Sequence, residues 1–228
     1  MKVLVFNGSP KGNKSDTIHI TKAFIEGMKT VTTIEEKIIN VNEKKINHCL
    51  GCFVCMKNDG TCVQKDDMKE ILEDILLADI LIFSFPLYCY GMPAPLKNII
   101  DRTMPLSKMT FIKENDKYRH LGRNDYSQKK YVMISGCGFP SKSNNFEAVT
   151  KQFELCFPNN HSMITVTESP LFNIKEASPV TIPFLEVVKQ AGIEFIKGGK
   201  ISTETIKKLS IPMIPEDIYS QMANETNK

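Results

Sequence analysis

The sequence predicts an α/β fold with a doubly wound parallel sheet. Short apolar runs rich in β-forming residues alternate with segments of helical periodicity along most of the chain. The run 79–85 (DILIFSF) is apolar on both faces, which is typical of a central parallel strand. Because crossovers between parallel strands are right-handed, the intervening helices are expected on both faces of the sheet.

The expected elements follow from these periodicities. Strands are expected at 2–6, 37–41, 79–85, 130–135 and 163–166. Helices are expected at 15–29, from 66–67 onward, from 95 to about 103, from about 143, and from 183 to about 192, with short helices at 203–209 and 216–222. The polar stretch 107–128 lacks a clean period and is expected to be an insertion or an irregular segment. We expect one domain at 1–195, with a cysteine-rich loop at 47–64, and a C-terminal extension at 196–228.

Composition narrows the class of protein. The chain has 228 residues, of which 42% are hydrophobic, and a net charge of +3 from 29 basic and 26 acidic side chains. This balance does not indicate a nucleic-acid partner. There is no long apolar stretch and no signal-peptide pattern, so a cytoplasmic protein with reduced thiols is expected. The seven cysteines are therefore not expected to form a disulfide framework.

The loop after the first predicted strand has the composition of an anion site. It reads NGSPKGNKSDT over residues 7–17 and leads directly into a helix. Glycine allows close backbone approach, while the hydroxyls of Ser9, Ser15 and Thr17 and the first helical amides can donate to phosphate oxygens. The alternative is an ordinary strand-to-helix loop with Ser15 or Asp16 as the N-cap.

Two further loops that follow predicted strands also have an unusual composition. They cover 86–93 and 135–140 and follow the third and fourth predicted strands. In a parallel sheet, these loops and the first one all lie at the carboxyl edge, where ligands of doubly wound folds bind. The sequence therefore predicts a ligand site built from three loops.

A compact cysteine cluster lies after the second predicted strand. Cys49, Cys52, Cys55 and Cys62 follow the pattern C-x2-C-x2-C-x6-C. Closely spaced thiolates suit an iron–sulfur cluster, which needs several soft ligands around one small inorganic core. A zinc site with four thiolates is one alternative. The other is no metal, with the thiols packing near the ligand or acting as a redox pair.

These residues resemble the flavodoxin-like fold, in the branch of NADPH-dependent FMN reductases and iron–sulfur flavoproteins. The motifs that carry the resemblance are 8–11 with Ser15 and Thr17, 86–88 with 92–97, 101–102, and the cysteine cluster with 66–68. The resemblance implies a five-stranded parallel sheet in the order 2-1-3-4-5. It also implies an FMN cofactor.

The resemblance places the FMN phosphate in the first loop, its ring against the second, and the third loop beside the ring. The implied cofactor-binding residues are Ser9, Lys11, Asn13, Ser15, Asp16, Thr17, Pro86, Leu87, Tyr88, Cys89, Tyr90, Gly91, Ser135, Gly136, Cys137 and Gly138. For the second loop, the alternative is a Pro-broken turn with Tyr88 and Tyr90 packed in the core. No catalytic residue is predicted, because a flavin itself carries the chemistry.

The implied function is an NAD(P)H-dependent FMN oxidoreductase, forming a homodimer or homotetramer. It would pass electrons to a quinone, a flavin or a protein acceptor, directly or through a four-iron four-sulfur cluster on Cys49, Cys52, Cys55 and Cys62. No G-x-G-x-x-G fingerprint follows a strand, so NAD(P)H is expected only as a transient co-substrate. The alternatives are a reductase without a cluster and a flavodoxin-like electron carrier without its own substrate.

Overall fold

The computed structural model describes residues 1–114 and 116–226. Its centre is a five-stranded sheet in the order β2-β1-β3-β6-β7, in which all neighbouring strands are parallel. The strands are β1 (Lys2–Asn7), β2 (Glu35–Asn40), β3 (Ile80–Pro86), β6 (Lys130–Gly136) and β7 (His161–Val166). Because β4 and β5 form a separate hairpin, this order is the predicted 2-1-3-4-5, and the predicted fold class is confirmed.

The central strands β1, β3 and β6 form where the sequence is mostly apolar on both faces, whereas the edge strand β2 is largely exposed and β7 alternates. In β1, Val3 and Val5 contribute to one core, and Leu4 and Phe6 contribute to the core on the other side of the sheet. All four side chains are buried. Since helices cover both faces of the sheet, near-continuous apolar runs mark its central strands.

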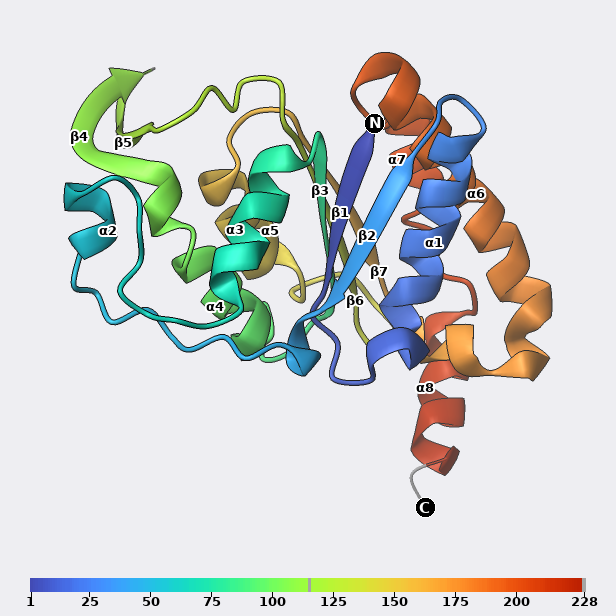
Figure 1. Ribbon diagram of the computed structural model, residues 1–228. Coiled ribbons are helices and arrows are strands. Elements are labelled where there is room, and N and C mark those ends of the chain that lie inside the picture. Colours follow the sequence, from blue (N-terminus) through green and yellow to red (C-terminus); the bar gives the residue numbers. More distant parts are fainter. Residues whose placement is uncertain (115, 227–228) are drawn as a thin grey trace.

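Helices cover both faces of the sheet (Figure 1). On one side lie α1 (Asp16–Lys29), α6 (Ser178–Gly198) and α7 (Thr203–Lys208), and on the other α3 (Met68–Leu77), α4 (Ala94–Asp101) and α5 (Glu147–Cys156). The short helix α2 (Val54–Lys57) lies farther out, and α8 (Glu216–Thr226) projects past the carboxyl ends of the strands. The 3₁₀ turns are Gly12–Lys14, Val41–Glu43, Met104–Leu106, Ser169–Asn173 and Lys175–Ala177.

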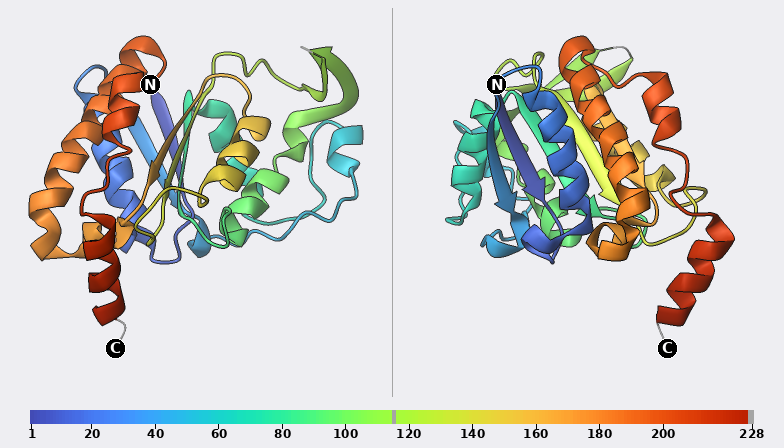
Figure 2. Two further views of the ribbon diagram at one scale, coloured as in Figure 1. Left: turned by 180° about the vertical axis from the view of Figure 1, so that it is seen from behind. Right: turned by 90° about the vertical axis from the view of Figure 1, so that its right-hand side faces the viewer.

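Of the two alternatives for 107–128, an insertion or an irregular segment, the second is wrong for 107–114 and 117–122, which form a hairpin. Strands β4 (Ser107–Glu114) and β5 (Lys117–Gly122) pair antiparallel, and the Phe111 and His120 rings stack with centroids 4.6 Å apart. Figure 2 shows this hairpin standing away from the central sheet, on the side of α2. Its side chains are mostly exposed, so no alternation of polar and apolar residues marked it as strands.

Two helices have different boundaries from those expected. Helix α6 begins before Pro183 and ends beyond Gly192, because Phe184, Val188 and Phe195 continue one apolar stripe against α1. Helix α5 begins at Glu147 rather than near residue 143. The turn before it includes Asn144 in the left-handed conformation, with φ of 61°, which a regular helix does not accommodate.

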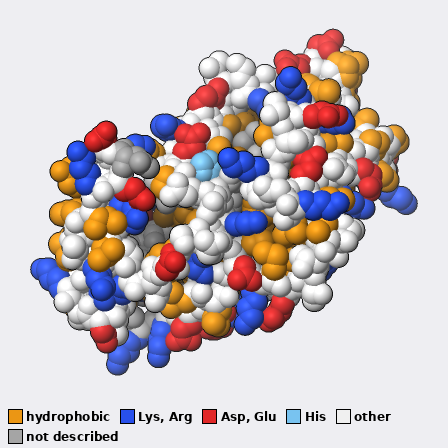
Figure 3. Space-filling view, turned by 90° about the horizontal axis from the view of Figure 1, so that it is seen from above, with side chains coloured by type: hydrophobic (Ala, Val, Ile, Leu, Met, Phe, Trp, Pro, Cys, Tyr) orange, Lys and Arg blue, Asp and Glu red, His pale blue; other side chains and the backbone are white. Residues whose placement is uncertain are grey.

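The surface carries charges of both signs. Seen from above, Lys and Arg side chains are interspersed with Asp and Glu over the described residues, with apolar groups in small patches between them (Figure 3). This arrangement agrees with the balanced composition. Of the helices in the described ranges, none has both the length and the hydropathy needed to cross a bilayer.

Acid should weaken the attachment of α7 through Glu194. Burial opposes ionisation of this carboxylate, but hydrogen bonds from Ser202, Gln190 and Thr205 outweigh it and lower the Glu194 pKa to about 2. The ionised group therefore contributes stability above its ordinary pKa of 4.5, and this contribution is lost as the pH falls towards 2. We expect Glu194→Gln to flatten the pH dependence of the free energy of unfolding in this range, measured by denaturant titration. The same change at exposed Glu225 should leave that dependence as it is; a steep wild-type-like slope in Glu194→Gln would contradict the assignment.

Candidate functional site

The three predicted loops meet at the carboxyl edge of the sheet, as expected (Figure 1). The amide of Gly8 donates to Ser84 O at 2.8 Å, which joins the end of β1 to β3. The amide of Leu87 donates to Gly136 O at 2.7 Å, which joins the second loop to the third. A Cβ added at Gly136 would lie 3.1 Å from Thr17 Cγ2, so the third loop also approaches the first. The three loops therefore lie side by side at this edge of the sheet.

The first loop presents a buried group of hydroxyls. Ser9, Ser15 and Thr17 are all buried, and Ser15 Oγ lies 2.8 Å from Thr17 Oγ1. Ser15 occupies the N-cap position of α1, but among the described residues its side chain makes no capping hydrogen bond to the helix. The helix start therefore has a hydroxyl pair beside amides that a side-chain cap does not occupy, an arrangement suited to an oxyanion.

The exposed residues of the first loop include charged side chains, and a residue from a distant part of the chain holds this loop in place. Lys11, Asn13 and Lys14 are exposed, and Lys11 Nζ lies 3.3 Å from Asp16 Oδ2. Asn173 Nδ2 donates to Lys14 O at 3.1 Å and to the Asp16 carboxylate. Asn173 was not predicted as a site residue, because it comes from the turn after β7, more than 150 residues along the chain. Only its position in the folded structure shows that Asn173 lies beside the first loop.

The second loop is a tight turn that displays two tyrosines. The amide of Gly91 donates to Tyr88 O at 2.9 Å, and the two central residues, Cys89 and Tyr90, have φ of 47° and 62°. Positive φ at both positions is typical of a type I′ turn, which usually contains Asn or Gly. Tyr88 and Tyr90 are 48% and 54% exposed, so they do not pack in the core as the alternative required. Such left-handed strain at non-glycine residues is concentrated at functional sites.

The third loop is divided between buried and exposed residues. Ser135 and Gly136 end β6, and Ser135 Oγ is buried with no hydrogen-bond partner among the described residues. Cys137 packs in the core beneath the loop, and burial raises the pKa of its thiol. Gly138 and Phe139 are exposed beyond it. The unpartnered Ser135 hydroxyl and the open surface of Gly138 are the features here that suit a ligand.

The C-terminal extension is anchored to the same edge by Glu168. This residue lies two positions after the end of β7, is fully buried, and has φ of 56°. Its carboxylate accepts hydrogen bonds from the amides of Met213, at 2.7 Å, and Ile214, at 3.1 Å. Burial raises the Glu168 pKa. Tyr219 on α8 is buried nearby, and burial, followed by the charge of Glu168, raises its pKa to about 12. No sequence pattern predicted this anchor.

The cysteine loop brings its predicted ligands to one cavity. Cys49, Cys52, Cys55 and Cys62 all line a hollow of about 30 Å³, together with Met104. Burial raises the Cys55 pKa, and negative charge on the other three sulfurs would raise it further. Within residues 1–114 and 116–226, no three His, Cys, Asp or Glu side chains are arranged to hold a single metal ion. The four cysteines thus line one hollow, but within the described residues their side chains are not placed to hold a metal ion.

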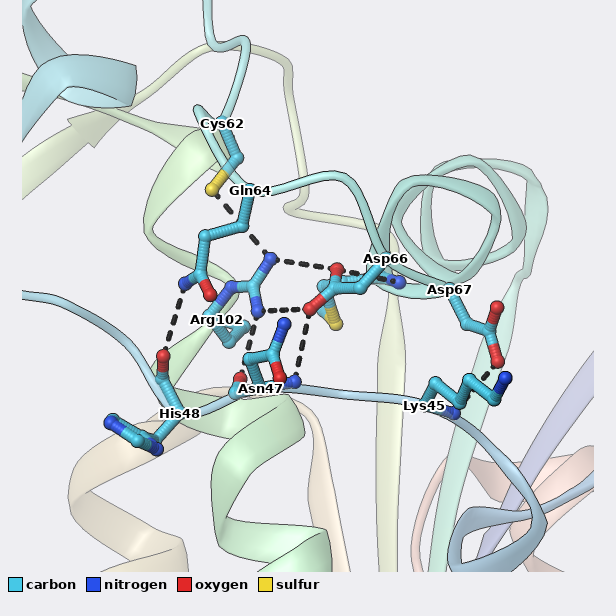
Figure 4. Close-up of polar contacts among 9 residues, drawn as sticks. Lys45, Asn47, His48, Cys62, Gln64, Asp66, Asp67 and Arg102 are labelled. Carbon is cyan, nitrogen blue, oxygen red and sulfur yellow. Dashed lines mark hydrogen bonds and ion pairs between the residues drawn. The ribbon is translucent and has the colours of Figure 1, made fainter.

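A buried ion pair fixes the end of the cysteine loop (Figure 4). The Arg102 guanidinium donates to Asp66 through both terminal nitrogens, at 2.7 and 2.9 Å, and the side chains are only 2% and 4% exposed. Nη1 also donates to Asn47 O at 2.8 Å, and Nη2 to Cys62 Sγ at 3.6 Å. Burial opposes the charge of Asp66, yet hydrogen bonds from Arg102 and Asn47 keep its pKa below the usual value. Both ends of the loop are therefore tied to α4.

Comparisons with known proteins agree with this architecture. A family model described as "Flavodoxin-like fold" matches residues 1–173. An iron-sulfur flavoprotein from Archaeoglobus fulgidus is 37% identical over 103 residues, which are 45% of this chain and 49% of that protein. An FMN-dependent NADH:quinone oxidoreductase from Metamycoplasma arthritidis is 29% identical over 158 residues, 68% of this chain and 78% of that one.

Among solved structures, an FMN-dependent NADH-azoreductase from Bacillus anthracis in complex with FMN superposes with a TM-score of 0.62 at 17% identity. The superposition covers 86% of this chain and 99% of that one, which shows a common fold. The iron-sulfur flavoproteins match this chain over about half of their own length. The family model, by contrast, extends from β1 through the turn after β7 and so includes all three loops of the site. The chain therefore belongs to the family with the flavodoxin-like fold.

Proposed function

We propose that this chain is an FMN-dependent oxidoreductase that takes electrons from NAD(P)H and passes them to a quinone, a flavin or a protein acceptor. The observation that carries the proposal is the meeting of the hydroxyl-rich, tyrosine-bearing and glycine-bearing loops at one edge of the sheet. Bound FMN would supply the redox chemistry, since a flavin accepts either a hydride or single electrons. The names of the Metamycoplasma relative and the Bacillus structure support this choice.

The chain's own residues fit such a cofactor. The hydroxyls of Ser9, Ser15 and Thr17 can donate to the phosphate, and Lys11 can add positive charge at the rim. A Cβ at Gly8 would lie 3.0 Å from Leu96 Cδ2, so the chain passes the start of α4 with no room for a side chain. Tyr88 and Tyr90 provide exposed aromatic surface for the ring.

We also propose that the cysteine loop holds a four-iron four-sulfur cluster, ligated by Cys49, Cys52, Cys55 and Cys62. Support comes from their compact spacing, from their common cavity and from the names of the iron-sulfur flavoprotein relatives. The cluster would supply one-electron transfer when present. A zinc site has less support, because three of the cysteines fall at two-residue intervals, whereas zinc loops usually separate two pairs of ligands.

Steady-state assays test the proposed activity. FMN-loaded protein should oxidise NADH or NADPH with menadione or ferricyanide as acceptor. An electron carrier without its own substrate would show no turnover with either nucleotide. We further propose a homodimer or homotetramer, which light scattering of the loaded protein would identify; a monomer mass would exclude both.

Removing hydroxyls from the first loop should weaken FMN binding. Ser9→Ala with Thr17→Ala deletes two buried hydroxyls, and hydrogen bonds to a charged phosphate are worth about 1.5–3 kcal/mol each. We expect the dissociation constant to rise at least ~100-fold, measured by titration of apoprotein with FMN fluorescence. Ser210→Ala, an exposed hydroxyl on the C-terminal extension, is the matched control. Unchanged FMN affinity in the double variant would count against the phosphate assignment.

A further inference from the structure

We propose that Arg102 is a positioning residue for the cysteine site, which holds the sulfur of Cys62 and raises the reduction potential of the cluster bound there. This inference rests on the proposed iron–sulfur cluster. It concerns a residue from outside the cysteine pattern, 40 positions from Cys62 along the chain. The contacts of the Arg102 guanidinium, its burial and its place in the fold support this role.

The contact with the sulfur is direct. Arg102 Nη2 lies 3.6 Å from Cys62 Sγ, a hydrogen-bond distance for a sulfur acceptor. The same nitrogen donates to Asp66 Oδ1 at 2.9 Å. Figure 4 shows the guanidinium between Cys62 on one side and Asp66 on the other. Arg102 thus bridges one predicted ligand and one carboxylate.

The guanidinium has little freedom to leave this position. Asp66 holds it through both oxygens, and the backbone fixes that carboxylate in turn, because the amides of Asn47 and Met68 donate to it at 3.0 and 3.2 Å. Arg102 is only 2% exposed, so water does not compete for its donors. A paired arginine of this kind is pre-organised, and its planar fork sets the direction of the remaining N–H bond.

The position of Arg102 connects the two proposed redox sites. It is the C-cap residue of α4, the helix whose N-terminal end directly follows the tyrosine-bearing second loop. Its side chain reaches back across this helix end to both ends of the cysteine loop, at Asn47 and Asp66. The geometry therefore ties Cys62 to the C-terminal end of the helix that follows the second loop, as well as within its own loop.

The expected consequence is electrostatic. Hydrogen bonds to cluster sulfurs and nearby positive charge stabilise the more negative, reduced form of an iron–sulfur centre and raise its potential. Cys49 and Cys52 are exposed, and the Cys49 sulfur accepts a hydrogen bond from the backbone amide of Gly51 at 3.5 Å. Among the described residues, Cys62 is the proposed ligand whose sulfur accepts a hydrogen bond from a positively charged side chain, so a change at Arg102 acts on the potential through Cys62.

Anaerobic redox titration with dithionite tests the inference, with iron and acid-labile sulfide measured on the same samples. Arg102→Lys keeps the positive charge beside Asp66 but lacks the fork that reaches Cys62. We expect the equilibrium constant for cluster reduction to fall on the order of tenfold, which is ~59 mV for one electron. The potential should move to a lower value, while the iron content per chain is retained.

Arg123→Lys is the matched control. Arg123 also ties down the cysteine loop, but it donates to backbone oxygens, those of Cys55 at 2.9 Å and Asn58 at 2.6 Å. Its replacement should leave the potential at the wild-type value. Equal shifts in the two variants, or no shift in Arg102→Lys, would overturn the inference. Wild-type protein without iron or sulfide after anaerobic reconstitution would instead overturn the cluster proposal itself.

Asp66→Asn provides a second variant should Arg102→Lys fail to fold. It keeps an oxygen that accepts from the guanidinium but removes the negative charge that partly neutralises Arg102. The potential should therefore rise, opposite in sign to the shift in Arg102→Lys. A lower potential in Asp66→Asn would contradict the inference.

Discussion

Arg102→Met lowers the free energy of unfolding by about 3–5 kcal/mol, because it leaves the Asp66 carboxylate buried without its counter-ion. The carboxylate would retain only the amides of Asn47 and Met68. The loss should be measured by urea unfolding of the metal-free chain, so that cluster loss does not contribute. It should also be smaller below pH 4, where protonation of Asp66 relieves the unpaired charge.

Arg119→Met is the matched control for this prediction. Arg119 also forms a close ion pair, with Nε 2.6 Å from Glu114 Oε2, but both side chains are about half exposed. Exposed pairs contribute about 0–1 kcal/mol, so this variant should unfold close to the wild type. Equal losses in the two variants would mean that burial of the Arg102–Asp66 pair does not determine its effect.

Gly192→Ala should destabilise the fold by about 3 kcal/mol or more, since it would overpack the contact between α1 and α6. A Cβ at Gly192 would lie 2.1 Å from Phe24 O, and one at Gly27 would lie 1.9 Å from Lys189 O. Both obstacles are backbone atoms, which cannot turn aside as a side chain does. The helices would have to separate, at the cost of their shared apolar contacts.

Gly198→Ala on the same helix is the control for Gly192→Ala. Nothing lies within 4 Å of a Cβ added there, so only helix propensity changes, and stability should rise by up to about 1 kcal/mol. Thermal and denaturant unfolding of both variants measure the difference. A Gly192→Ala protein as stable as the wild type would show that the two helices do not approach as closely as described.

The fold was largely predictable because its central strands β1, β3 and β6 are buried on both faces. An apolar run such as 79–85 is typical of a buried parallel strand. Because parallel strands all end at the same edge of the sheet, the loops that follow them share that edge. The β4–β5 hairpin was missed because exposure on both faces leaves no periodicity. Helix α6 was predicted too short because Pro183, usually a boundary, lies inside it.

The site was predictable only where its residues are close along the chain. The hydroxyl side chains of residues 9–17 and the four cysteines can be recognised from their close spacing along the chain. Asn173, Glu168 and Arg102 act on loops between 36 and 159 positions away, and no local pattern reports such distances. The left-handed conformation of Cys89 and Tyr90 could not be predicted from the sequence either, since neither residue type favours that conformation.

The absorption spectrum of the protein purified without oxygen tests the central claim most directly. We expect flavin bands that stay with the protein through gel filtration and bleach when NADH or NADPH is added. A shoulder beyond the long-wavelength edge of the flavin would in addition indicate the cluster. A colourless protein that takes up no FMN on incubation would contradict the assignment of the three loops as an FMN site.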